Sequence, residues 1–188
     1  MASILDGLPS SEQEAREAWK FATPIIEAGL AGLTLSPKQQ SMLDLVREGL
    51  SVADICDISK QERDAMLLQG YRFIKQGDLK KAEDWLMGLH QLDQLDERVI
   101  YALAVTMQAK GDFARAAKLY VTFLALDATN AEGYLRLGEC FLSAKEYDNA
   151  QACFRVGQAE CNRGNGTPQA AEHAKQMLAY VAERRSAS

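Results

Sequence analysis

The chain has 188 residues, of which 47% are hydrophobic and 25% charged, and its formal net charge is −5. This composition is typical of a globular domain with a sizeable core, and no apolar run is long enough to span a membrane. The negative charge and the lack of a basic stripe argue against nucleic-acid binding. The four cysteines form no CxxC pair and no histidine cluster accompanies them, so we expect reduced thiols, no metal site and no cofactor.

Residues 1–62 are predicted to form an N-terminal helical segment. A first helix is expected over about 10–23, where Pro24 ends or kinks it, and a second is expected to begin near Lys38. The segment contains ten acids and five bases, so its net charge of −5 equals that of the whole chain.

Near the end of this segment, residues 49–59 are a short connector with apolar residues at irregular spacing. Ser59 ends it, and Glu62 stands three residues later. This spacing is a capping box, which predicts that a helix begins at residue 60.

Residues 63–164 repeat three times without a gap, as units 63–96, 97–130 and 131–164. The aligned positions hold small, aromatic or large apolar residues: Gly70, Ala104 and Gly138; Phe73, Met107 and Phe141; Leu79, Phe113 and Tyr147; Ala82, Ala116 and Ala150; Leu86, Tyr120 and Phe154. A 34-residue period with these residue types is typical of the tetratricopeptide repeat, a helical hairpin that stacks into a solenoid. We therefore predict an all-α fold whose three repeats form a concave right-handed solenoid; the alternative is a helical bundle whose periodicity matches by chance.

Each repeat is expected to be a pair of helices, and the expected bounds are 60–76 with 79–92, 95–110 with 113–126, and 131–144 with 147–162. The small residue of the first helix and the aligned alanine of the second let the two helices approach closely. Gly77 and Gly111 suit the turn between them, where Lys145 is the one departure.

Residues 165–188 are predicted to form a C-terminal capping helix and tail. Thr167 is the expected N-cap, and the helix is expected to run to about Arg184. Its apolar face would cover the last repeat and consists of Ala170, Ala174, Met177, Leu178 and Val181.

In a stacked array the first helix of each unit lines the inner face, with its second, fifth, ninth and twelfth residues exposed. The predicted peptide-binding groove consists of Leu67, Tyr71, Ile74, Tyr101, Val105, Gln108, Leu135, Glu139 and Leu142. Asp64, Arg98 and Glu132 stand at the second positions, which places charges at the rim of a mostly apolar groove.

This composition favours an extended peptide with spaced apolar anchors over a C-terminal carboxylate, because a carboxylate clamp needs Lys, Arg and Asn at these positions. Tyrosine offers contact area at low entropy cost and can hydrogen-bond a peptide backbone. The alternative is that Tyr71 and Tyr101 are covered by the chain's own N-terminal helix or by a second copy.

The chain resembles the class II chaperones of bacterial type III secretion over about residues 47–161. The resemblance rests on the connector, on three repeats followed by one closing helix, and on these motifs: Gly70-Tyr71-Arg72-Phe73, Lys75-Gln76-Gly77, Ala82-Glu83, Ala116-Ala117-Lys118-Leu119-Tyr120, Gly138-Glu139-Cys140 and Ala150-Gln151-Ala152-Cys153-Phe154. It implies an all-helical cradle in the bacterial cytoplasm that binds hydrophobic secreted translocator proteins, without stable membrane association. It also implies that Tyr71 and Tyr101 contact a proline- and leucine-spaced client segment and that the chain forms a homodimer through its N-terminal helices.

Two functions therefore remain open: an ATP-independent export chaperone that keeps translocators soluble, and a generic repeat adaptor or scaffold, including a transcriptional co-regulator. An enzyme is not expected. His90 and His173 are isolated on predicted helices, and Arg163-Gly164-Asn165-Gly166 lacks the lysine and the strand of a nucleotide-binding loop.

Overall fold

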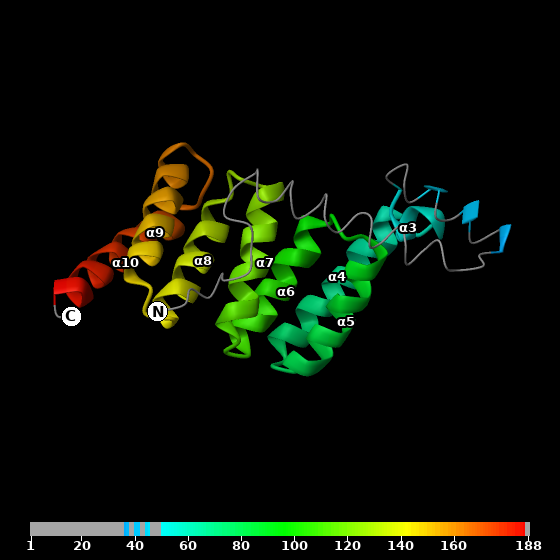
Figure 1. Ribbon diagram of the computed structural model, residues 1–188, viewed down its shortest axis with the longest axis horizontal. Coiled ribbons are helices and arrows are strands. Elements are labelled where there is room, and N and C mark those ends of the chain that lie inside the picture. The colour runs from blue at the N-terminus through cyan, green and yellow to red at the C-terminus, as the bar shows by residue number, and fades with distance from the viewer. Residues whose placement is uncertain (1–35, 38–39, 42–43, 46–49, 187–188) are drawn as a thin grey trace. The chain divides into compact units, whose positions relative to one another are not determined.

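The structure, a computed structural model, describes residues 36–37, 40–41, 44–45 and 50–186 (Figure 1). The helix expected over 10–23 lies outside the described residues. Of the helix expected from Lys38, the described positions 37, 40–41 and 44–45 are helical. The described residues fall into two compact units, one ending at Ile58 and the other beginning at Ser59.

The described part of the chain has eight helices with defined bounds: α3 (Val52–Ile55), α4 (Lys60–Lys75), α5 (Leu79–Leu92), α6 (Glu97–Ala109), α7 (Phe113–Leu126), α8 (Ala131–Ser143), α9 (Tyr147–Asn162) and α10 (Pro168–Ser186). α3 belongs to the smaller unit. Ser51 Oγ accepts a hydrogen bond from the backbone of Asp54, whose carboxylate accepts one from the backbone of Ser51, so a capping box starts this one-turn helix.

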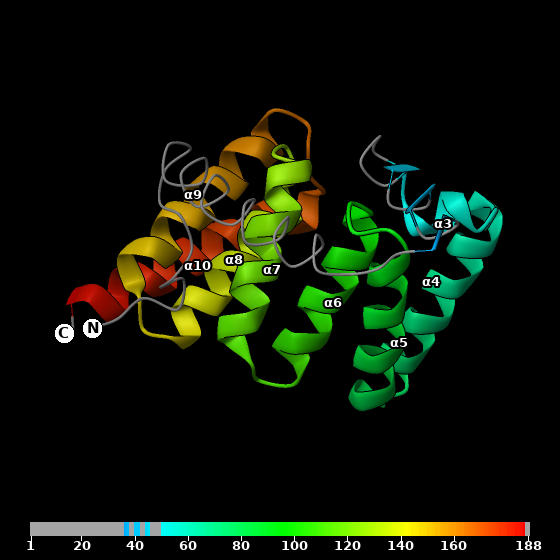
Figure 2. The same cartoon turned by 45° about the vertical axis from the view of Figure 1, so that its right-hand side comes forward.

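The larger unit contains α4 to α10, which stack side by side in chain order (Figures 1 and 2). The hairpins α4/α5, α6/α7 and α8/α9 are the three predicted repeats, and their bounds agree with the expected ones to within two residues. α6 begins at Glu97 because Asp96 caps it, and the capping box predicted at Ser59 and Glu62 starts α4. The predicted all-α tetratricopeptide fold is confirmed.

The small residues of the first helices allow the close approach of the second helices that the repeat pattern predicts. A Cβ added at Gly70 would lie 2.5 Å from Leu86 Cδ2, and one added at Gly138 would lie 2.6 Å from Phe154 Cε1. Gly70 and Gly138 therefore each admit a large side chain from the second helix of the same repeat, which brings the two helices together.

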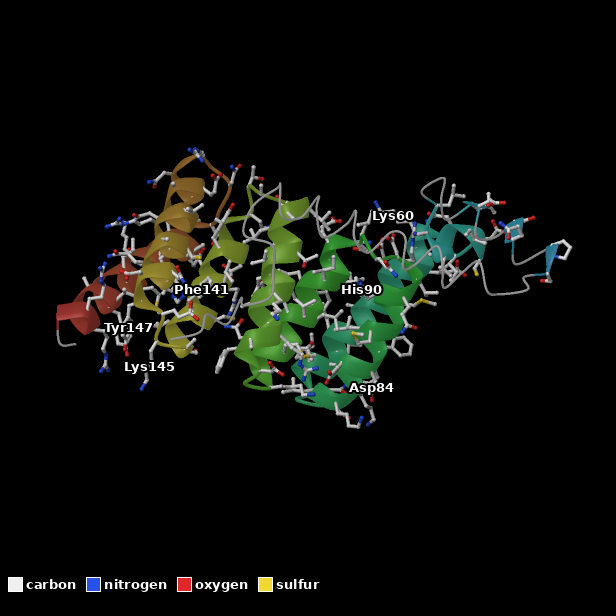
Figure 3. The ribbon with its side chains drawn as sticks, viewed as in Figure 1. Lys60, Asp84, His90, Phe141, Lys145 and Tyr147 are labelled. Carbon is white, nitrogen blue, oxygen red and sulfur yellow. The ribbon has the colours of Figure 1, made fainter. Side chains whose placement is uncertain are left out.

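The turn inside each repeat requires a left-handed residue. Gly77 and Gly111 adopt φ of 76° and 79°, and Lys145 takes φ of 62° at the equivalent point of the third repeat. Figure 3 shows Lys145 at the turn between α8 and α9, with its side chain pointing away from the helices. The departure in sequence thus keeps the backbone conformation, although a side chain at this φ is disfavoured.

The buried residues of the larger unit form two clusters that together span the repeats, and α10 closes the one that includes the third repeat. Phe141 and Phe154 are buried in the third repeat, and Leu86 and Leu103 are buried between the first and second. Ala170, Ala174 and Val181 of α10 are buried, with Met177 and Leu178 packed beside them, so the capping face is as predicted. Thr167 Oγ1 accepts a hydrogen bond from the backbone of Ala170, which confirms the predicted N-cap.

Candidate functional site

The residues predicted to line the groove come from α4, α6 and α8, the first helices of the three repeats. These helices follow one another in a row, because α4 contacts α6 and Gln108 of α6 donates a hydrogen bond to Glu139 of α8. Seven of the nine reach the surface wholly or in part: Tyr71, Ile74, Tyr101, Val105, Gln108, Glu139 and Leu142.

The exposure expected of Leu67 and Leu135 is wrong. Leu67 is 7% exposed, in a core cluster with Leu86 and Leu103, and Leu135 is 1% exposed. Leu135 lies against Gly157 of α9, where an added Cβ would approach Leu135 Cδ2 to 2.8 Å. Because Gly157 leaves this space, the leucine packs inward, and the fifth position of these two units supports the groove from beneath.

Tyr71 and Tyr101 lie together at a hollow in the surface of the larger unit. This hollow has a volume of about 340 Å³ and is lined by Tyr71, Glu97, Arg98, Tyr101, Phe123, Asp127, Asn130 and Glu132. Residues of the first and second repeats thus meet those at the start of the third, which is the arrangement expected of a groove that crosses the repeats.

The two tyrosines differ in how firmly the protein holds them. Tyr101 is half-buried, with its ring centroid 5.0 Å from that of Phe123 and 5.8 Å from that of Tyr120. Tyr71 is 38% exposed. Burial raises the pKa of both phenols, so both stay neutral and can donate a hydrogen bond. The ring of Tyr101 is therefore held by its packing against Tyr120 and Phe123, whereas the ring of Tyr71 is exposed.

Arg98 lies at the edge of the hollow, and two carboxylates engage its guanidinium. Its Nη1 is 2.5 Å from Asp64 Oδ1, and its Nη2 is 2.7 Å from Asp96 Oδ2. The hydrogen bonds to Asp96 and then to Asp64 raise the pKa of Arg98. Since this cation is already paired twice, it has little capacity left to bind a free carboxylate, in line with the predicted lack of a carboxylate clamp.

A chain of hydrogen bonds crosses the floor of the groove farther along. Tyr120 Oη donates to Gln108 Oε1 at 2.7 Å, and Gln108 Nε2 donates to Glu139 Oε2 at 2.7 Å. Arg136 Nη1 lies 3.4 Å from the same carboxylate oxygen. His173 Nε2 lies 2.9 Å from Glu139 Oε1. Gln108 and Glu139 are therefore engaged within the protein, and the groove is more polar than its sequence pattern indicates.

Tyr120, Arg136 and His173 also belong to this floor and were not among the residues predicted to line the groove. A signal for His173 was present, because it stands 34 residues after Glu139 and so occupies the ninth position of a unit that α10 would begin. Tyr71, Val105, Glu139 and His173 form one column across the first helices. The remaining apolar wall consists of Ile74, Val105 and Leu142, which are partly buried.

The tetratricopeptide-repeat family profile matches residues 107–160. The chaperone protein SicA of Salmonella typhimurium is 27% identical over 113 residues, which are 60% of this chain and 68% of SicA. None of the helices in the described part of the chain has the length and apolar character needed to span a membrane.

Solved structures share the fold. A type III secretion complex from Aeromonas hydrophila matches with a TM-score of 0.72 at 21% identity, covering 79% of this chain and 99% of that one. The translocator chaperone SycD of Yersinia enterocolitica matches with a TM-score of 0.66 at 18% identity, covering 72% and 93%. PcrH, crystallised with the chaperone-binding region of PopD, matches with a TM-score of 0.64 at 22% identity, covering 68% and 96%.

Proposed function

We propose that this chain is a class II tetratricopeptide-repeat chaperone of type III secretion and that it binds an extended apolar segment of a translocator protein in its groove. Binding keeps the translocator soluble in the bacterial cytoplasm before export. The chaperone needs no ATP for this, because its action is to cover apolar surface and release it later.

The observation that carries the proposal is the accessible pair Tyr71 and Tyr101 at one hollow on the row of first helices. An exposed aromatic ring beside a half-buried one offers a rigid surface for the apolar carbons of a client side chain, at low entropy cost. PcrH, which shares this fold, was crystallised with the chaperone-binding region of the translocator PopD. The fold and the surface therefore support the same kind of ligand.

The groove can supply moderate, releasable affinity. Ile74, Val105 and Leu142 provide apolar contact beyond the hollow. Each anchor side chain that the groove buries contributes about 1.5–3 kcal/mol before the cost of ordering the segment. Affinity of this size suits a carrier that must release its client to the export machinery.

The parts of the chain have different proposed roles. Residues 63–164, as units 63–96, 97–130 and 131–164, bind the client, and residues 165–188 close the array. Residues 1–62 mediate formation of a homodimer. SycD, which shares the fold, has been crystallised as an alternative dimer.

Co-expression with a hydrophobic translocator from the same operon tests the proposal. We expect a soluble complex that copurifies with the chaperone, while the translocator alone is insoluble. Tyr71→Ala should weaken the complex without loss of helicity, because Tyr71 is exposed and lies outside the core clusters. Tyr180→Ala is the matched control, since Tyr180 is similarly exposed, at 41%, on α10.

Copurification that survives Tyr71→Ala together with Val105→Ala would place the client elsewhere on the molecule. A translocator that stays insoluble, with other soluble partners captured instead, would favour the adaptor function. Circular dichroism on each variant separates loss of binding from loss of fold.

A further inference from the structure

The hollow at Tyr71 and Tyr101 combines aromatic rings with carboxylates. Its rings are those of Tyr71, Tyr101 and Phe123, and its carboxylates are Glu97, Asp127 and Glu132. A volume of about 340 Å³ accommodates a long side chain. A purely apolar anchor would not use the carboxylates, so the lining points to a side chain with an apolar stem and a polar head.

The charge of the hollow is negative even with Arg98 in its lining. Arg98 pairs with Asp64 and Asp96, which lie beside the hollow and bring further negative charge to its edge. Asp127 accepts hydrogen bonds from two neutral groups, Thr129 Oγ1 at 3.0 Å and Asn130 Nδ2 at 2.9 Å. Neither partner compensates its charge.

Glu132 pairs with Arg136, with 3.1 Å between Arg136 Nε and Glu132 Oε1. Arg136 is shared with Glu139. Its single positive charge is thus divided between two carboxylates and leaves the Glu132 side of the hollow negative. Glu97 is exposed at the first turn of α6.

An anion is the competing occupant, because α6 and α8 both begin at the hollow and helix N-termini attract negative charge. Both ends already have caps within the protein. Asp96 accepts from the backbone of Arg98 at 3.0 Å, and Asn130 accepts from the backbone of Gly133 at 3.0 Å. With the N-termini capped and carboxylates around them, charge complementarity selects a cation.

We propose that the hollow binds a lysine or arginine side chain of the client segment, with its stem against Tyr71 and Tyr101 and its charged head beside Glu97, Asp127 and Glu132. A cation over an aromatic face gains electrostatic attraction, and the stem buries apolar surface. This rests on the proposed function and adds one element to it: the client segment carries a basic residue at a fixed place among its apolar anchors.

The first test uses small probes and needs no client. The ring signals of ¹³C-labelled tyrosines, assigned with Tyr71→Phe and Tyr101→Phe, are followed by NMR during titration with N-acetyl-lysine methylamide. The uncharged N-acetyl-norleucine methylamide and the anionic N-acetyl-aspartate methylamide are the comparison probes. We expect saturable shifts of Tyr71 and Tyr101 with the lysine probe only.

Glu97→Gln combined with Glu132→Gln should weaken binding of the lysine probe by roughly three- to tenfold. Glu172→Gln combined with Glu183→Gln is the control, because it removes the same charge from α10, which does not line the hollow. Equal shifts with norleucine, preference for the aspartate probe, or no effect of Glu97→Gln/Glu132→Gln would overturn the inference.

The outcome is separable from that of the proposed function. If a translocator copurifies but the lysine probe does not shift the tyrosines, the chaperone function stands and the cation site is refuted. If the lysine probe binds as described but no translocator copurifies, the site stands and the proposed client class is refuted.

Discussion

His173 of the closing helix α10 lies 2.9 Å, from Nε2 to Oε1, from Glu139 of α8. The two residues are one repeat period apart, so α10 continues the column of ninth positions along the groove. Glu139 also accepts from Gln108, which accepts from Tyr120. The last helix is therefore linked by hydrogen bonds to the floor of the groove as far as the second repeat, in addition to covering the core.

His173→Ala should lower the free energy of unfolding by about 0.5–1.5 kcal/mol, because one hydrogen bond between α8 and α10 is lost. Denaturation by urea, followed by circular dichroism, measures the change. Gln176→Ala is the control on the same helix, since the hydrogen bond of Gln176 is to Glu172 one turn earlier, at 3.4 Å, and does not link two helices. Equal effects of the two substitutions would show that the link between the helices carries no stability.

Two glycines in helices should respond in opposite directions to alanine. At Gly138 an added Cβ lies 2.6 Å from Phe154 Cε1, so Gly138→Ala should destabilise the protein by about 1–3 kcal/mol. At Gly88, in α5, an added Cβ meets nothing within 4 Å among the described residues, and Gly88→Ala should stabilise the protein by up to about 1 kcal/mol. Thermal melts of both variants decide this, and a shared sign would contradict the packing argument.

The fold was predictable because the same packing requirements recur at the same positions of all three repeats. Gly138 and Phe154 are explained by the same close approach as Gly70 and Leu86, and three copies of one pattern exclude most chance readings. The start of α4 was also readable, since the capping box at Ser59 depends only on neighbouring residues. Local chemistry and periodicity together thus determined the element bounds.

The site was less predictable because exposure depends on partners in other helices. Leu135 packs into the space that Gly157 leaves on α9, and a pattern of first-helix positions does not show that space. The hydrogen-bonded floor likewise depends on how side chains from α6, α7, α8 and α10 meet, such as Tyr120 with Gln108. Tyr71 and Tyr101 were expected in the groove, and both line the hollow; their role in binding stays a prediction.

Asp96 should contribute to loss of stability in acid. Burial alone would raise the pKa of this carboxyl, but its hydrogen bonds and charge interaction with Arg98 bring the pKa below its ordinary value. A carboxyl with a lowered folded-state pKa adds stability above its unfolded pKa, near 4, and this stability is lost as the pH falls through the folded value. Urea denaturation between pH 3 and 7 should show a smaller fall of unfolding free energy below pH 4 for Asp96→Asn than for the parent.

Asp84→Asn is the comparison for this pH series, because the Asp84 side chain is 64% exposed and pairs with Lys80 on its own helix. Its profile below pH 4 should follow that of the parent protein. If Asp96→Asn and the parent lose stability in parallel, the pairing of Asp96 with Arg98 does not contribute to the acid transition.

Lys145→Gly should stabilise the protein by about 0.5–1 kcal/mol. Lys145 adopts φ of 62°, a left-handed conformation that costs a residue with a side chain about 1–2 kcal/mol. Glycine removes this cost, but its greater conformational freedom in the unfolded chain offsets part of the stabilisation. Gly111→Ala, at the equivalent turn with φ of 79° and no steric obstacle within 4 Å of an added Cβ, provides the reverse experiment and should destabilise the protein. Since both turns have the same geometry and neither change alters packing, urea denaturation of the two variants isolates the backbone effect. A loss of stability in Lys145→Gly would mean that the lysine side chain makes a stabilising interaction that outweighs its backbone strain.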